Sequence, residues 1–189
     1  SELVYRYANR TKDRLYFSAL DGGYNRLIEY DPVTGDTQQL PLPSTESAYI
    51  FSSSHHLIDI YIASNSWTHA GKDQMYNHLT GTLEELDLEP SGEFDNPGWI
   101  TSERILVKSH DGEEVPLSLI YRKGLKLDGK NPTLLSGYGS YGSVSGVGYY
   151  TARLPWLEKG GVYAIAHVRG GGEFGKEWHL AGRMQNKPN

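Results

Sequence analysis

Short apolar and polar runs alternate through the first hundred positions, and most runs end at a turn signal. A period of two predicts half-buried β-strands rather than helices. Asp21-Gly22-Gly23 predicts a tight hairpin turn, because glycine adopts positive φ without steric cost. Strands are expected over 14–20, 26–30, 37–40, 48–51, 57–64 and 74–78. Repeated antiparallel meanders of this kind favour the blades of a β-propeller, with a β-sandwich as the alternative.

The pattern of expected elements changes after a Pro- and Gly-rich stretch at 90–98. This change predicts a domain boundary between residues 1–99 and 100–189. A hairpin is expected next, turning at Asp111-Gly112. Two apolar strands then flank a helix, and a last helix is expected at the end of the chain. These elements cover 103–109, 115–121, 132–135, 153–159, 161–167 and 176–184. Strand, helix, strand implies a parallel crossover, so the fold class is mixed β and α/β.

Each expected parallel strand runs into a glycine-rich turn. The first turn is Gly137-Tyr138-Gly139-Ser140-Tyr141-Gly142. It is not a nucleophile elbow centred on Ser140, because Gly-x-Ser-x-Gly requires glycine where this chain has Tyr138. The better interpretation is an oxyanion loop, in which a tyrosine hydroxyl supplies one donor. The alternative is a glycine turn whose tyrosines only pack.

The second turn is Arg169-Gly170-Gly171-Gly172-Glu173. Gly170-x-Gly172-x-x-Gly175 matches the dinucleotide-binding fingerprint literally, since it follows a strand and precedes a helix. The acidic residue that should follow about 20 positions later falls at or beyond position 189. A tight backbone turn is therefore favoured, and no cofactor is expected. His167, inside the preceding strand, is interpreted as a core histidine.

Composition excludes several classes of protein. Hydrophobic residues make up 38% and charged residues 22%, which is typical of a globular chain. The net charge of −5, with both signs interspersed, argues against nucleic-acid partners and against a polybasic membrane patch. No apolar run approaches the roughly 18 residues of a membrane span. The chain has no cysteine, so thiolate chemistry and disulfides are excluded, and the spacing of its histidines suggests no metal site.

Three segments together resemble the prolyl oligopeptidase family of serine peptidases, in the branch that contains prolyl oligopeptidase and oligopeptidase B. They are Lys123 to Pro132, Gly137 to Gly142, and Val168 to Glu173. The resemblance implies that residues 1–99 are the last blades of a β-propeller and that 100–189 open an α/β-hydrolase domain. It makes Tyr138 the oxyanion-hole tyrosine and Tyr141 a residue lining the pocket for the side chain before the cut. Arg169, Gly170, Gly171, Gly172 and Glu173 become a structural turn that shapes the site.

The same resemblance implies that the catalytic serine, aspartate and histidine lie beyond residue 189. The chain is thus expected to be an inactive internal fragment. Its parent is expected to hydrolyse short peptides through an acyl-enzyme, after proline or after basic residues. Gly146 and Gly148 stand where the branch that cuts after basic residues carries acidic residues. The choice between cleavage after proline and cleavage after basic residues therefore stays open.

The expected partners are short peptides and the remainder of the parent chain, with no nucleic acid and no membrane. The expected compartment is the cytoplasm, with the periplasm as the alternative. A non-catalytic binding or structural module is the competing class of function.

Overall fold

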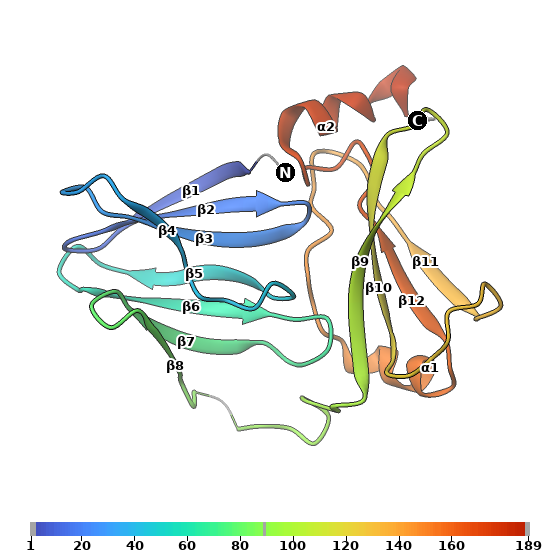
Figure 1. The fold of residues 1–189 in the computed structure, drawn as a ribbon, viewed down its shortest axis with the longest axis horizontal. Helices are drawn as coiled ribbons and strands as arrows, with labels where there is room; N and C mark the ends of the chain where they lie inside the picture. Colours follow the sequence, from blue (N-terminus) through green and yellow to red (C-terminus); the bar gives the residue numbers. More distant parts are fainter. Residues whose placement is uncertain (1–2, 89, 188–189) are drawn as a thin grey trace.

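The computed structural model describes residues 3–88 and 90–187, which form three four-stranded sheets (Figure 1). The first two sheets are antiparallel, and in each the strands lie in sequence order. Their strands are β1 (Val4–Arg10), β2 (Leu15–Asp21), β3 (Tyr24–Tyr30), β4 (Thr37–Gln39), β5 (Ser47–Ser53), β6 (Asp59–Asn65), β7 (Lys72–Asn77) and β8 (Thr82–Glu85). The predicted antiparallel β structure is confirmed, and β1 and β8 are additions that the pattern did not predict.

The third sheet is mixed, in the order β11-β12-β10-β9. Its strands are β9 (Ile100–Lys108), β10 (Glu114–Arg122), β11 (Thr133–Ser136) and β12 (Val162–Ala166). β11 and β12 pair in parallel, as predicted, and β12 pairs antiparallel with β10. The crossover between β11 and β12 contains a 3₁₀ turn (Thr151–Arg153) and α1 (Leu154–Glu158). The fold class is therefore mixed β and α/β, while the division at residue 99 stays a prediction.

The last helix, α2 (Gly175–Ala181), is shorter than the expected 176–184. It ends at Gly182, which packs directly against the backbone of Arg169 and Gly170. A 3₁₀ turn (Met184–Asn186) follows. A side chain at position 182 would collide with that backbone, so tertiary packing rather than helix propensity sets the end of α2.

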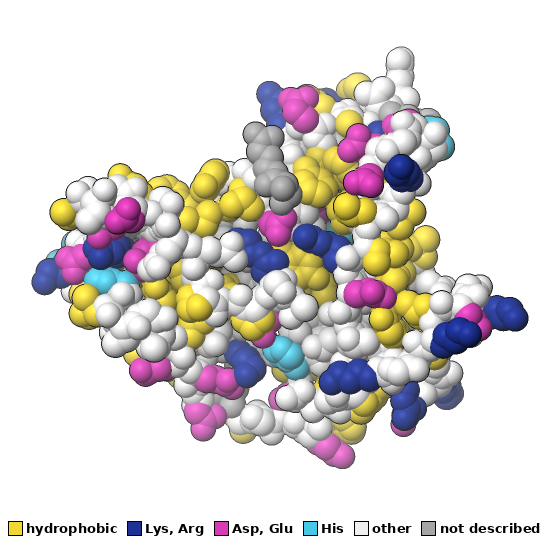
Figure 2. Space-filling model, in the orientation of Figure 1, with side chains coloured by type: hydrophobic (Ala, Val, Ile, Leu, Met, Phe, Trp, Pro, Cys, Tyr) yellow, Lys and Arg dark blue, Asp and Glu magenta, His cyan; other side chains and the backbone are white. Residues whose placement is uncertain are grey.

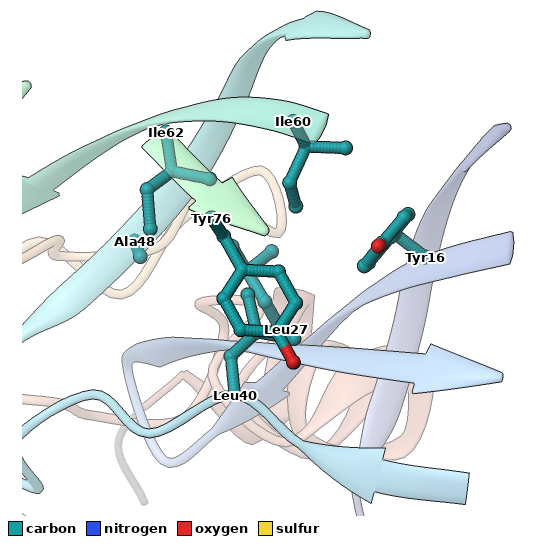
Figure 3. Close-up of a cluster of buried hydrophobic side chains, with 7 residues drawn as sticks. All are labelled: Tyr16, Leu27, Leu40, Ala48, Ile60, Ile62 and Tyr76. Carbon is teal, nitrogen blue, oxygen red and sulfur yellow. The ribbon is translucent and has the colours of Figure 1, made fainter. Parts of the chain in front are cut away.

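The first two sheets face each other across one hydrophobic core, which Figure 3 shows in close-up. Period-two alternation produces it, since Ile60 and Ile62 are buried while their neighbours in β6 are only half-buried. Its members come from both sheets and the segment between them: Tyr16, Leu27, Leu40, Ala48, Ile60, Ile62 and Tyr76. The rings of Tyr16 and Tyr76 meet edge to face at 6.3 Å.

A second buried cluster joins the first sheet to the third. Tyr24 lies at its centre, and the indole Nε1 of Trp67 donates to the Tyr24 hydroxyl at 3.1 Å. The guanidinium groups of Arg26 and Arg104 each lie 5.0 Å from the Tyr24 ring centroid. Arg104 also donates to the Asp21 carbonyl oxygen at 2.8 Å. Figure 2 shows basic side chains gathered in the notch between these two sheets. The β2–β3 turn is thus anchored to β9.

We expect Gly23→Ala to destabilise the protein more than Gly35→Ala. Both glycines have positive φ, +98° and +82°, so each substitution costs about 1–2 kcal/mol of backbone strain. A Cβ at Gly23 would also lie 2.9 Å from His167 Nδ1, whereas a Cβ at Gly35 would meet nothing within 4 Å. The steric contact should add about 1–3 kcal/mol at Gly23. Urea unfolding of both variants of the full-length protein measures the difference, and equal losses would contradict the packing of the turn on His167.

Candidate functional site

The carboxyl ends of β11 and β12 meet at one edge of the third sheet, because the two strands are parallel neighbours. Both glycine-rich turns leave from this edge. Figure 1 shows α2 at this end of the sheet and α1 at the opposite end. In open α/β sheets, ligands bind outside the carboxyl ends of the strands. The structure therefore brings the two predicted turns to the position where a site is expected.

The two turns are joined through their backbones. Gly142 N–H donates to the Gly170 carbonyl oxygen, and Gly172 N–H donates to the Ser143 carbonyl oxygen, both at 3.0 Å. A Cβ at Gly170 or at Gly172 would collide with a carbonyl oxygen of the first turn. Glycine is needed at these positions because the two backbones approach so closely.

The fingerprint-like glycines have no N–H group left for a phosphate. The amides of Gly170, Gly171, Gly172 and Gly175 donate in turn to the carbonyl oxygens of Trp178, Val168, Ser143 and Gly172. A dinucleotide site depends on free N–H groups that point at the pyrophosphate. The arrangement does not fit that ligand, and the glycines instead serve packing inside the chain.

The Glu173 carboxylate lies inside the second turn and is only 1% exposed. Its Oε1 accepts a hydrogen bond from Ser145 N–H at 2.9 Å and lies 3.8 Å from His167 Nδ1. A Cβ at Gly171 would collide with Oε2. A carboxylate of the chain itself thus fills the space that the glycines leave open.

His167 is fully buried, as predicted for a core histidine. Its Nε2 lies 2.8 Å from Ser118 Oγ on β10, and Ser118 is fully buried as well. Ser118, His167 and Glu173 thus follow one another in the order of a catalytic triad, but His167 Nδ1 forms no hydrogen bond with Glu173 in the described part of the chain. A substrate cannot reach them, because all three residues are at most 1% exposed.

Arg169 ties the second turn to the tip of the β9–β10 hairpin. Its guanidinium forms an ion pair with Asp111 and donates to Ser109 Oγ at 3.4 Å. The hydrogen bond from Arg169 lowers the pKa of Asp111 to about 2, and the same bond raises the pKa of Arg169. The sequence predicted a turn at Asp111-Gly112, but nothing local to it indicates a partner 58 residues away.

The two predicted site tyrosines are exposed, Tyr138 by 58% and Tyr141 by 87%. In the described part of the chain, no group hydrogen-bonds the Tyr138 hydroxyl. Tyr141 has φ +57°, a left-handed conformation that costs a non-glycine residue about 1–3 kcal/mol. This strain has no sequence signal, since glycine rather than tyrosine normally marks such a position.

A cleft of about 420 Å³ separates the two turns from the first sheet. Tyr5 and Tyr7 of β1 lie on one side of it, and Gly142, Gly172 and His179 lie on the other. His179 Nδ1 is 2.8 Å from the Gly170 carbonyl oxygen, which holds α2 against the second turn. The cleft therefore lies at the junction of the first and third sheets, and neither Tyr138 nor Tyr141 lines it.

Neither a metal centre nor a membrane span is found in residues 3–88 and 90–187. No three of their His, Asp and Glu side chains gather closely enough to hold a metal ion. None of their helices has both the length and the apolar composition that a membrane crossing requires.

Comparison with known proteins gives consistent matches. The family model described as "Prolyl oligopeptidase family" matches residues 149–189. The prolyl endopeptidase of Elizabethkingia meningoseptica is 34% identical over 176 residues, which are 92% of this chain and 25% of that protein. Protease 2 of Moraxella lacunata is 33% identical over 182 residues, 94% of this chain and 26% of that protein. The chain spans about a quarter of the length of these curated relatives.

Solved structures match over nearly the whole chain. A prolyl endopeptidase structure has a TM-score of 0.86 and 31% identity, and the match covers 100% of this chain and 28% of the other. Oligopeptidase B from Trypanosoma brucei has a TM-score of 0.84 at 24% identity over 97% of this chain and 27% of the other, which shows the fold alone. The mostly β structure matches the propeller region of these peptidases and fits a mixed β and partial α/β fold, and the chain belongs to the prolyl oligopeptidase family.

Proposed function

We propose that this chain is part of a serine oligopeptidase that hydrolyses short peptides through an acyl-enzyme. In this proposal Tyr138 donates its hydroxyl to the oxyanion that forms when the scissile carbonyl is attacked. The nucleophilic serine, its histidine and its aspartate lie outside these 189 residues, so the chain is inactive on its own. Residues 1–99 and 100–189 are its two domains.

The observation that carries the proposal is the placement of the first glycine-rich turn. The turn lies at the carboxyl end of β11 and is joined to the second turn by two backbone hydrogen bonds. It holds an exposed tyrosine whose hydroxyl has no partner in the described part of the chain. A hydroxyl donor that has no partner, on a turn whose backbone is held by hydrogen bonds, suits an oxyanion hole, which needs its donors close at hand when charge develops.

The strained backbone of Tyr141 supports a role for its ring at the substrate. A residue in a costly conformation persists only where the surrounding structure holds it, and such residues cluster at ligand sites. We assign Tyr141 to the pocket for the side chain that precedes the cut. Arg169 and Glu173, which bracket the three glycines, shape the site and take no part in the chemistry.

The substrate preference is for proline or a basic residue before the cut, and the compartment is the cytoplasm or the periplasm. Relatives at comparable identity carry different printed names, among them prolyl endopeptidase and protease 2. These names support peptide hydrolysis. The proposal therefore keeps both preferences, for proline and for a basic residue before the cut.

Tyr138→Phe in the full-length protein should lower kcat by about 10²–10³, equivalent to about 2.7–4 kcal/mol. The substitution removes one preorganised donor and leaves the turn intact. KM should change little, because the donor acts mainly in the transition state. Steady-state kinetics on a peptide amide test this, with circular dichroism as the folding control. Near-normal kcat in a folded variant would show that the tyrosine only packs.

Tyr141→Ala serves as the contrasting variant. It removes a surface for the substrate side chain, so kcat/KM should fall by a factor that depends strongly on the residue before the cut. A uniform loss across substrates would argue against Tyr141 as a pocket residue.

A serine-directed fluorophosphonate should label the full-length protein outside these 189 residues. No serine of the sequence lies in a Gly-x-Ser-x-Gly elbow. Ser118, which lies next to a histidine and near a glutamate, is fully buried. Peptide mapping by mass spectrometry locates the modified serine. A label on Ser118, or on any other serine of this chain, would overturn the proposal that the nucleophile lies elsewhere.

A further inference from the structure

We propose that Glu173 is a positioning residue for the loop that carries Tyr138, held in place by a buried bridge through His167 to Ser118. The inference rests on the proposed function. It gives a role to three buried polar groups that the proposed chemistry leaves unused. Within this bridge Glu173 sets the position of the loop and never touches the substrate.

The bridge connects three separate segments. Ser118 lies on β10, His167 directly follows β12, and Glu173 lies in the second glycine-rich turn. Ser118 Oγ is 2.8 Å from His167 Nε2, and His167 Nδ1 is 3.8 Å from Glu173 Oε1. The imidazole thus lies between the serine of the sheet and the carboxylate of the turn, and the three side chains are buried together.

Glu173 in turn holds the first loop. Its Oε1 accepts the N–H of Ser145, and the Ser143 carbonyl oxygen two residues earlier accepts from Gly172 of the same turn. Val147, two residues further on, is buried in the cluster between the sheets. The chain from Gly142 to Ser145, which directly follows the loop of Tyr138, is therefore attached to the second turn at successive points.

The bridge is polar where an apolar side chain would pack. His167 Nδ1 and Glu173 Oε2 are buried and have no hydrogen-bond partner in the described part of the chain. Buried polar groups without a partner are costly, so a polar network that keeps them in a core calls for an explanation. Arg169 does not neutralise Glu173, because its guanidinium is paired with Asp111. A polar bridge kept at this cost points to a positional role.

The test is a double-mutant cycle in the full-length protein, with a peptide amide as substrate. Glu173→Ala should lower kcat by about 10²-fold and leave KM within a few fold, since a misplacement of about 1 Å costs this much. Glu173→Gln keeps an acceptor for Ser145 N–H and should restore most of kcat. Glu177→Gln, on the exposed side of α2, is the matched control and should match the wild type.

The decisive measurement is Glu173→Ala combined with Tyr138→Phe. If Glu173 acts through Tyr138, the double variant should lose little more than Tyr138→Phe alone, because both changes remove the same donor. Losses that multiply, or an unchanged kcat in a folded Glu173→Ala variant, would overturn the positioning role and leave the role of Tyr138 standing. Near-normal kcat in Tyr138→Phe would instead overturn the proposed oxyanion role itself.

Ser118→Ala keeps the test decisive if Glu173→Ala does not fold. It removes only the hydroxyl at the far end of the bridge and creates little space. A smaller loss of kcat is expected, again without multiplication in the Tyr138→Phe background. Wild-type kcat in Ser118→Ala would overturn the bridge.

Discussion

The buried carboxylate of Glu173 is the constraint around which the two glycine-rich turns are built. A carboxylate removed from water is costly unless its neighbours supply hydrogen bonds or charge. Here the one hydrogen bond to its oxygens within the described part of the chain comes from the amide of Ser145, while the imidazole of His167 and the turn at Gly23 lie against the side chain. Each must approach closely, and a Cβ at Gly171 would already collide with the carboxylate. Three segments distant in the sequence therefore meet around one buried carboxylate.

The same buried carboxylate also explains why the glycines of a dinucleotide-binding fingerprint do not indicate a dinucleotide in this chain. Glycine-rich turns that bind phosphate leave their N–H groups directed outward. In this chain the corresponding amides donate to carbonyl oxygens, and an internal carboxylate fills the remaining space. The glycines are used for close packing between two loops. What distinguishes the two uses is the destination of the backbone hydrogen bonds, which the spacing of glycines does not encode.

Features of the fold that depend on neighbouring residues in the sequence could be predicted. The Asp21-Gly22-Gly23 hairpin and the parallel crossover follow from turn chemistry and apolar runs, and both are present. β1 was missed because most of it is exposed on both faces, so burial imposes no alternation on it, and β8 was missed because it is short and acidic. The pairs Arg169–Asp111 and Ser118–His167 join residues 58 and 49 positions apart, and no local pattern reports them. The roles of Tyr138 and Tyr141 stay predictions, since no contact to a substrate is present.

The packing between the first and third sheets and the geometry of the candidate site depend on the same turn, between β2 and β3. The β2–β3 turn carries Tyr24, which sits between two arginines in the cluster that joins the first sheet to the third. The same turn places Gly23 over His167 and Glu173 and so closes the bridge from water. Both His167 and Glu173 are at most 1% exposed beneath this turn. The propeller blades therefore do more than border the cleft, because their seating on the third sheet keeps buried the group that we propose positions Tyr138.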